Sequence, residues 1–145
     1  MTSGIVRYLY NMKSFEIKNT PKLIEHIMSE QLQLSDDNIA WQFNAHPNFA
    51  TMFKAKYPNF TKETYLRQAV ELLQENGFTF KIRCFTEDRK SKYSYLYSIE
   101  LYIDDVWQWE SDTRHETNLF IYWVNGALEQ FYRVMKERKI SGTKS

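Results

Sequence analysis

Apolar and polar residues alternate in three consecutive runs, at residues 78–84, 93–104 and 106–110. Alternation with a period of two is typical of strands that bury one face. A polar stretch, 87–92, joins the first two runs, and Asp104-Asp105 joins the last two as a tight turn. Because connections this short pair neighbouring strands in opposite directions, the pattern predicts a three-stranded antiparallel meander.

Three helices are predicted before this meander from apolar residues at helical spacing. The first begins at Thr20-Pro21 and is expected to run to about Leu34, where residues 35–38 are expected to stop it. The second opens at His46-Pro47 and ends before Pro58. Thr61 caps the third, and Asn76-Gly77 ends it. Residues 39–45 fit either a strand or a helical turn.

The longest predicted helix follows the meander. Residues 113–116 match a capping box, with Thr117 and Asn118 as alternative caps, and the helix is expected to end near Lys139. Residues 140–145 are then a polar tail that is expected to fray. Residues 5–18 alternate loosely and predict a strand at the start of the chain.

The chain is therefore predicted to be a single α+β domain over residues 1–145. Its order is an N-terminal strand, three helices, the three-stranded antiparallel meander and a long C-terminal helix that covers the sheet. Nine residues of the meander and the last helix are expected to form the core: Phe80, Ile82, Ile99, Leu101, Phe120, Trp123, Ala127, Leu128 and Phe131.

Composition narrows the class of protein. With 145 residues and 43% hydrophobic residues, the chain can bury a core without disulfides or metals, and Cys84 is the only cysteine. The net charge is +1, so no overall field directs the chain to nucleic acid or to an anionic membrane. The absence of a long apolar run and of a secretory signal pattern at the N-terminus favours a cytoplasmic protein without a membrane span.

Catalytic and cofactor motifs are lacking in the sequence. The three histidines, His26, His46 and His115, are far apart and fit no metal-ligand spacing, and Cys84 lies among apolar residues, where a thiol is inert. Glycine occurs only four times, and the sequence has no glycine-rich loop that could cradle phosphate. No cofactor and no metal site are predicted, and a binding protein is favoured over an enzyme.

An acidic stretch with two tryptophans is the first candidate site. Six acidic residues and one arginine occupy positions 100–116, and Trp107 and Trp109 are expected to share one strand face. Aromatic anchors ringed by charge are typical of protein-binding surfaces. The candidate partner-binding residues are Asp104, Asp105, Trp107, Trp109, Glu110 and Asp112. Ordinary turn chemistry for the acids, and burial of both tryptophans beneath the last helix, remain the alternative interpretation.

A basic hairpin is the second candidate site. Cations and tyrosines interleave there, and tyrosines two apart on a strand are spaced so that nucleic-acid bases can stack on them. The residues are Lys81, Arg83, Arg89, Lys90, Lys92, Tyr93 and Tyr95.

The function expected from these sites is non-catalytic. The sequence favours a small protein that binds another protein, in the manner of an inhibitor, antagonist or immunity protein. A nucleic-acid-binding accessory protein that uses the basic hairpin is the first alternative, and a small hydrolase with a carboxylate site is the second. A second copy of the chain is a further partner that the sequence leaves open.

Overall fold

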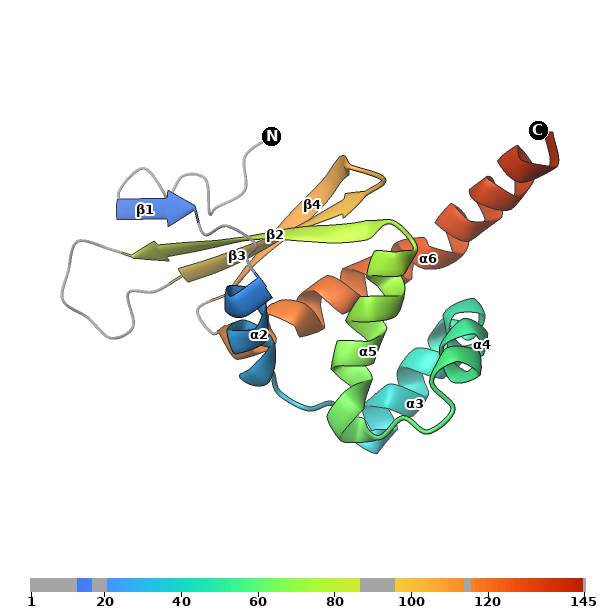
Figure 1. Ribbon diagram of the computed structural model, residues 1–145, viewed down its shortest axis with the longest axis horizontal. Coiled ribbons are helices and arrows are strands. Elements are labelled where there is room, and N and C mark those ends of the chain that lie inside the picture. Colours follow the sequence, from blue (N-terminus) through green and yellow to red (C-terminus); the bar gives the residue numbers. More distant parts are fainter. Residues whose placement is uncertain (1–12, 17–20, 87–95, 114–115, 145) are drawn as a thin grey trace. The chain divides into compact units, whose positions relative to one another are not determined.

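A computed structural model describes residues 13–16, 21–86, 96–113 and 116–144 (Figure 1). Residue contacts divide the chain into two compact units. The first unit is formed by residues 1–32 and 77–123, and the second by residues 33–76 and 124–145. The α+β class is confirmed, whereas a single domain spanning the whole chain stays a prediction.

The first unit contains a four-stranded antiparallel sheet. Its strands β1 (Lys13–Glu16), β2 (Phe78–Thr86), β3 (Leu96–Ile103) and β4 (Val106–Thr113) lie in the order β1-β2-β3-β4. The predicted meander is confirmed, and the strand expected near the N-terminus is described at Lys13–Glu16, where it pairs with β2. Helix α2 (Pro21–Ser29) follows β1.

Left-handed backbone at two places shapes the sheet. Gly77 has a φ of 89° between helix α5 (Lys62–Glu75) and β2, where a residue without a Cβ atom meets no steric penalty. Asp104 and Asp105 have φ values of 50° and 67° in the two-residue turn between β3 and β4. Two left-handed residues match the twist of the flanking strands, and aspartate tolerates this conformation better than most residues.

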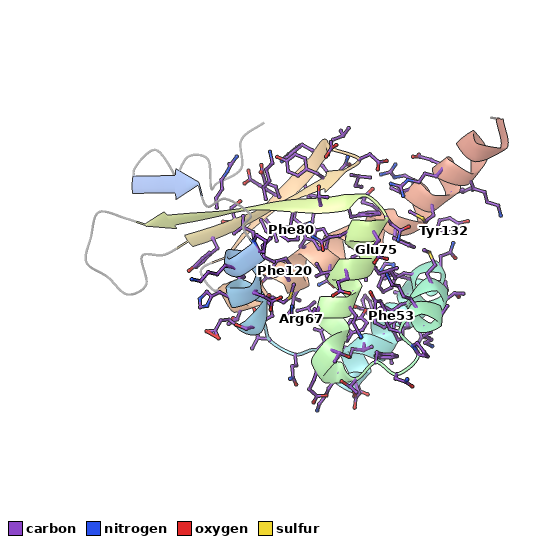
Figure 2. The ribbon with its side chains drawn as sticks, viewed as in Figure 1. Phe53, Arg67, Glu75, Phe80, Phe120 and Tyr132 are labelled. Atoms are coloured by element: carbon purple, nitrogen blue, oxygen red, sulfur yellow. The ribbon has the colours of Figure 1, made fainter. Side chains whose placement is uncertain are left out.

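The first turns of helix α6 (Leu119–Lys144) pack on the sheet. The Phe80 ring lies edge-on to Phe120 at 4.9 Å and to Trp123 at 5.4 Å between ring centroids (Figure 2). The Trp123 indole N–H donates a hydrogen bond of 3.2 Å to the backbone carbonyl of Thr79. The same side chain therefore supplies both apolar contact and a partner for its one polar atom.

The second unit consists of helices. They are α3 (Asp36–Ala45), α4 (Pro47–Lys56), α5 and the part of α6 from Val124 onward. Phe53 is fully buried at its centre, and its ring lies 5.0–5.7 Å from five other aromatic rings. These belong to Phe43, Phe49, Tyr57, Phe60 and Tyr65. Many of the aromatic residues, which make up 17% of the chain, therefore lie in the core.

A series of hydrogen bonds between polar side chains links three helices of the second unit. The Tyr65 hydroxyl donates to Gln42 Oε1 at 2.5 Å, and Gln42 Nε2 donates to Asn125 Oδ1 at 2.7 Å. Burial raises the pKa of Tyr65, so its hydroxyl keeps the proton that it donates. The buried Gln42 amide therefore has a partner on α5 for its oxygen and a partner on α6 for its nitrogen. A polar group of this kind is costly to bury without partners.

The stop predicted at residues 35–38 is wrong. α2 ends at Ser29, and residues 36–45 form α3, so the described residues before β2 form four helices where three were expected. Ser35 is the N-cap of α3, and its Oγ accepts a hydrogen bond of 3.1 Å from the Asn38 N–H. Asp36 and Asp37 follow in the first turn, where acids favour a helix.

The start of α6 differs from the predicted capping box, whereas Asn118, one of the two alternative caps, directly precedes its first residue, Leu119. Thr113 is the last residue of β4, and a 3₁₀ turn, η1 (Glu116–Asn118), precedes α6, so the helix does not begin at the predicted capping box. The Gln31 Oε1 atom accepts a hydrogen bond of 2.9 Å from the Phe120 N–H instead. At its other end α6 continues to Lys144, beyond the expected end near Lys139.

The predicted core residues are all buried. Phe80 and Trp123 lie on the sheet in the first unit, whereas Phe131 lies in the second unit, edge-on to Phe49 at 5.5 Å. The nine buried residues are Phe80, Ile82, Ile99, Leu101, Phe120, Trp123, Ala127, Leu128 and Phe131.

Candidate functional site

Exposed apolar residues follow directly after the acidic turn between β3 and β4. We call Asp104, Asp105, Val106 and Trp107 the hairpin tip. Both aspartates are exposed, and Val106 and Trp107 expose 61% and 49% of their surface. Two adjacent exposed apolar side chains form a small apolar patch, and an apolar patch bordered by polar residues is typical of an interaction site.

The two tryptophans of β4 do not share a face, which corrects the expectation from their spacing. Leu101 pairs with Trp109 and Tyr102 pairs with Trp107, so Gln108 is an extra residue that forms a β-bulge. The register places Trp109 beside Leu101 on the core-facing side, where it is half-buried. Trp107 lies beside Tyr102 on the outer side. Burial of both tryptophans beneath the last helix is therefore wrong for Trp107.

The buried carboxylate of Glu100 holds Trp107 in place on the outer face. Glu100 is only 5% exposed. Its Oε2 accepts a hydrogen bond of 3.2 Å from the Trp107 indole N–H and lies 3.7 Å from Arg83 Nη2, and its Oε1 accepts one of 3.1 Å from the Tyr102 hydroxyl. These three partners offset the desolvation of the charge. The tryptophan is thus fixed at one edge while half of its surface stays exposed.

Tyr102 links the Glu100 network to a lysine, Lys81. Partial burial is the main cause that raises the pKa of Tyr102, followed by the hydrogen bond to Glu100 and its negative charge. Lys81 opposes this shift, with its Nζ 4.9 Å from the centroid of the Tyr102 ring. Tyr102 therefore remains a neutral hydrogen-bond donor at physiological pH, as its bond to Glu100 requires.

The remaining acids extend along β4. Glu110 is half-buried, and its Oε2 accepts a hydrogen bond of 2.7 Å from the hydroxyl of buried Ser98. Asp112 is exposed and pairs with Ser98 in the strand register. β4 is an edge strand among the described residues, so its outer backbone groups face no further strand of that part of the chain. The acidic residues therefore accompany an edge that offers backbone hydrogen bonds.

The basic hairpin is described only in part. Arg89, Lys90, Lys92, Tyr93 and Tyr95 lie outside the described residues. Lys81 and Arg83 lie on the same outer face as Trp107, where they contact Tyr102 and Glu100. Both described cations are thus engaged by the sheet itself.

The described residues contain neither a cluster of metal ligands nor a helix that could span a membrane. Within the described residues, no three histidine, cysteine, aspartate or glutamate side chains gather as metal ligands would. His115 and the side chain of Cys84 lie outside that part. No helix described there combines the length and the apolar character needed to cross a bilayer.

Comparison with known protein families, with curated proteins and with solved structures finds no match for this chain.

Proposed function

We propose that this protein acts without catalysis, by binding another protein through the hairpin tip and the edge of β4. The observation that carries the proposal is the exposure of Val106 and Trp107 directly beside the two exposed aspartates. A rigid aromatic side chain loses little entropy when a partner covers it, and tryptophan is enriched among residues that dominate binding energy.

Support for tryptophan as the anchor comes from its fixed position. The hydrogen bond between Trp107 and Glu100 orients the indole before any partner arrives. Preorganisation of this kind favours affinity, because less freedom is lost on binding. The aspartates beside it attract a basic partner surface and accelerate association, while exposed charges add little to affinity itself.

The edge position of β4 suggests how a partner docks. An extended segment can pair with the backbone of an exposed edge strand, and its side chains then select the register. Glu110 and Asp112 would lie beside such a segment, so lysine or arginine in the partner suits the surface. A second copy of β4 would bring the same acids together, which disfavours pairing between two copies of this edge.

Replacing Trp107 by alanine should remove the binding. Loss of a central aromatic anchor costs about 2 kcal/mol or more, which is roughly a 30-fold loss of affinity. The immobilised chain and its variants would be exposed to nuclease-treated lysate of the cells that make the protein. Retained proteins would then be quantified by mass spectrometry. We expect at least one protein to be retained by the unchanged chain and depleted on Trp107→Ala.

Trp41→Ala is the matched control. Trp41 lies on α3 in the second unit and is 66% exposed, so its removal changes aromatic surface elsewhere by a similar amount. This variant should retain the partner. The proposal is contradicted if Trp107→Ala retains the same proteins as the unchanged chain. A parallel assay would use lysate without nuclease treatment. Retention that occurs only in the untreated lysate would favour the nucleic-acid alternative instead.

A further inference from the structure

A groove in the second unit lies where α4 begins and α6 passes. Two hollows of about 310 Å³ and 420 Å³ adjoin, because Asn48 and Tyr132 line both. The first also has His46, Phe49 and Phe131 in its wall. Volumes of this size lie at the lower end of the range for small-molecule sites. The groove is independent of the hairpin tip, which belongs to the first unit.

The floor of the first hollow is aromatic and firmly packed. Phe49 and Phe131 are almost fully buried, and their rings meet edge-on at 5.5 Å. Tyr132 projects from α6 and is 57% exposed (Figure 2). Phe49 and Phe131 therefore hold the base of the hollow rigid, and Tyr132 is the ring on which a flat apolar group can stack.

The second hollow supplies positive charge. Lys136 and Lys139 line it together with Met135, and Lys136 Nζ lies 5.9 Å from the centroid of the Tyr132 ring. Both lysines are exposed, so their ammonium groups are free to turn toward a bound anion. Neighbouring Glu137 does not cancel this charge, because it forms an ion pair of 3.1 Å with Arg133.

His46 borders the apolar hollow rather than the lysines. Desolvation lowers the pKa of His46, and the charge of Glu129 opposes this shift. The imidazole is therefore mainly neutral at physiological pH and offers a hydrogen bond without a charge. The groove is thus apolar at one end and cationic at the other.

We propose that this groove binds a small aromatic carboxylate. The ring of the ligand lies in the apolar hollow against the exposed ring of Tyr132, and its carboxylate points to Lys136 and Lys139. The separation of an apolar hollow from a cationic one selects a molecule with the same separation of its apolar and anionic parts.

The probes for the test are 2-naphthylacetate, the neutral 2-(2-naphthyl)ethanol and the cationic 2-naphthylmethylamine. Each would be titrated into the full chain labelled with ¹⁵N, and amide shifts would be followed by NMR. We expect the carboxylate to shift the amide signals of His46, Asn48, Phe49 and residues 131–139, with a dissociation constant in the range of about 1 mM. It should bind roughly three- to tenfold more tightly than the alcohol, which is what two exposed ion pairs supply.

Two variants separate the contributions of charge and shape. Lys136→Gln/Lys139→Gln should reduce the affinity for the carboxylate to that for the alcohol, whereas the control Lys54→Gln/Lys62→Gln, elsewhere in the second unit, should not change it. Asn48→Trp fills the shared wall of the hollows and should prevent binding of all three probes. Equal affinity for the three probes, shifts confined to other residues, or no shifts at about 10 mM probe would each overturn the proposal.

Discussion

Replacing Phe131 by alanine should lower the free energy of unfolding by about 3–5 kcal/mol. Phe131 is 1% exposed on α6, and its ring meets Phe49 edge-on in the second unit. The variant loses the burial of a whole aromatic ring and leaves a cavity that the packed helices fill only in part. Urea unfolding, followed by circular dichroism, measures the loss directly.

Tyr132→Ala is the control for this measurement, because the neighbouring side chain is more than half exposed. Its effect should stay within about 0.5 kcal/mol. If Phe131→Ala is no more destabilising than Tyr132→Ala, the buried face of α6 has been assigned wrongly.

Trp123→Ala should have an effect of similar size in the first unit, about 3–5 kcal/mol. The side chain is fully buried, packs edge-on against Phe80 and donates a hydrogen bond to the Thr79 carbonyl. Trp123→Phe retains most of the ring contact and leaves that carbonyl without its donor, so it should cost about 1–3 kcal/mol. Urea unfolding of both variants measures the two effects.

The same pair of sites tests whether the chain is one domain. In a single cooperative domain, Phe131→Ala and Trp123→Ala shift one common transition, because folding of either unit requires the other. Calorimetry distinguishes this from two transitions, of which each variant moves only one. For the hydrogen-bond prediction, the contradicting result is a Trp123→Phe variant with the same free energy of unfolding as the unchanged chain. That result would show that the indole hydrogen bond does not contribute to stability.

The sheet could be predicted from the sequence because its signal is local. Alternation along 78–84 and 96–103 identifies the apolar face of the sheet, and Ile82, Ile99 and Leu101 are indeed fully buried. Burial of Ser98 and Glu100 on the opposite face of β3 was not predicted by this pattern. The turn between the last two strands was predicted correctly from its two aspartates, because aspartate is one of the few residues that accept a left-handed backbone. Burial of α6 followed from its apolar stripe in the same way.

Helix α3 was predicted only as one of two alternatives for residues 39–45, and its start was mistaken for a stop because the residues that cap a helix are also those that end one. Ser35-Asp36-Asp37-Asn38 suits a turn, and it equally suits an N-cap followed by an acidic first turn. The helical spacing of Ile39 and Phe43, both buried, would have decided between the two. The spacing of apolar residues indicates which face of a helix is buried, whereas cap residues indicate only that a helix begins or ends there.

The candidate site was predicted in position but not in geometry. The acids and Trp107 surround the hairpin as expected, yet the β-bulge at Gln108 turns Trp107 to the outer face and leaves Trp109 on the inner one. The sequence has no mark of this bulge, because Gln108 is an ordinary strand residue. The contacts of Glu100 depend on three strands, and the groove joins residues 46–49 to 131–139, so neither is a local pattern.

Photo-cross-linking from the hairpin tip tests the proposed function most directly. A photoreactive benzoylphenylalanine at position 106, whose valine is 61% exposed, would be compared with the same group at position 41 in the cells that make the protein. Our account predicts a defined cross-linked protein from position 106 that is absent from position 41 and lost when Trp107→Ala is added. Cross-links that are the same from both positions, or none from position 106, would contradict it.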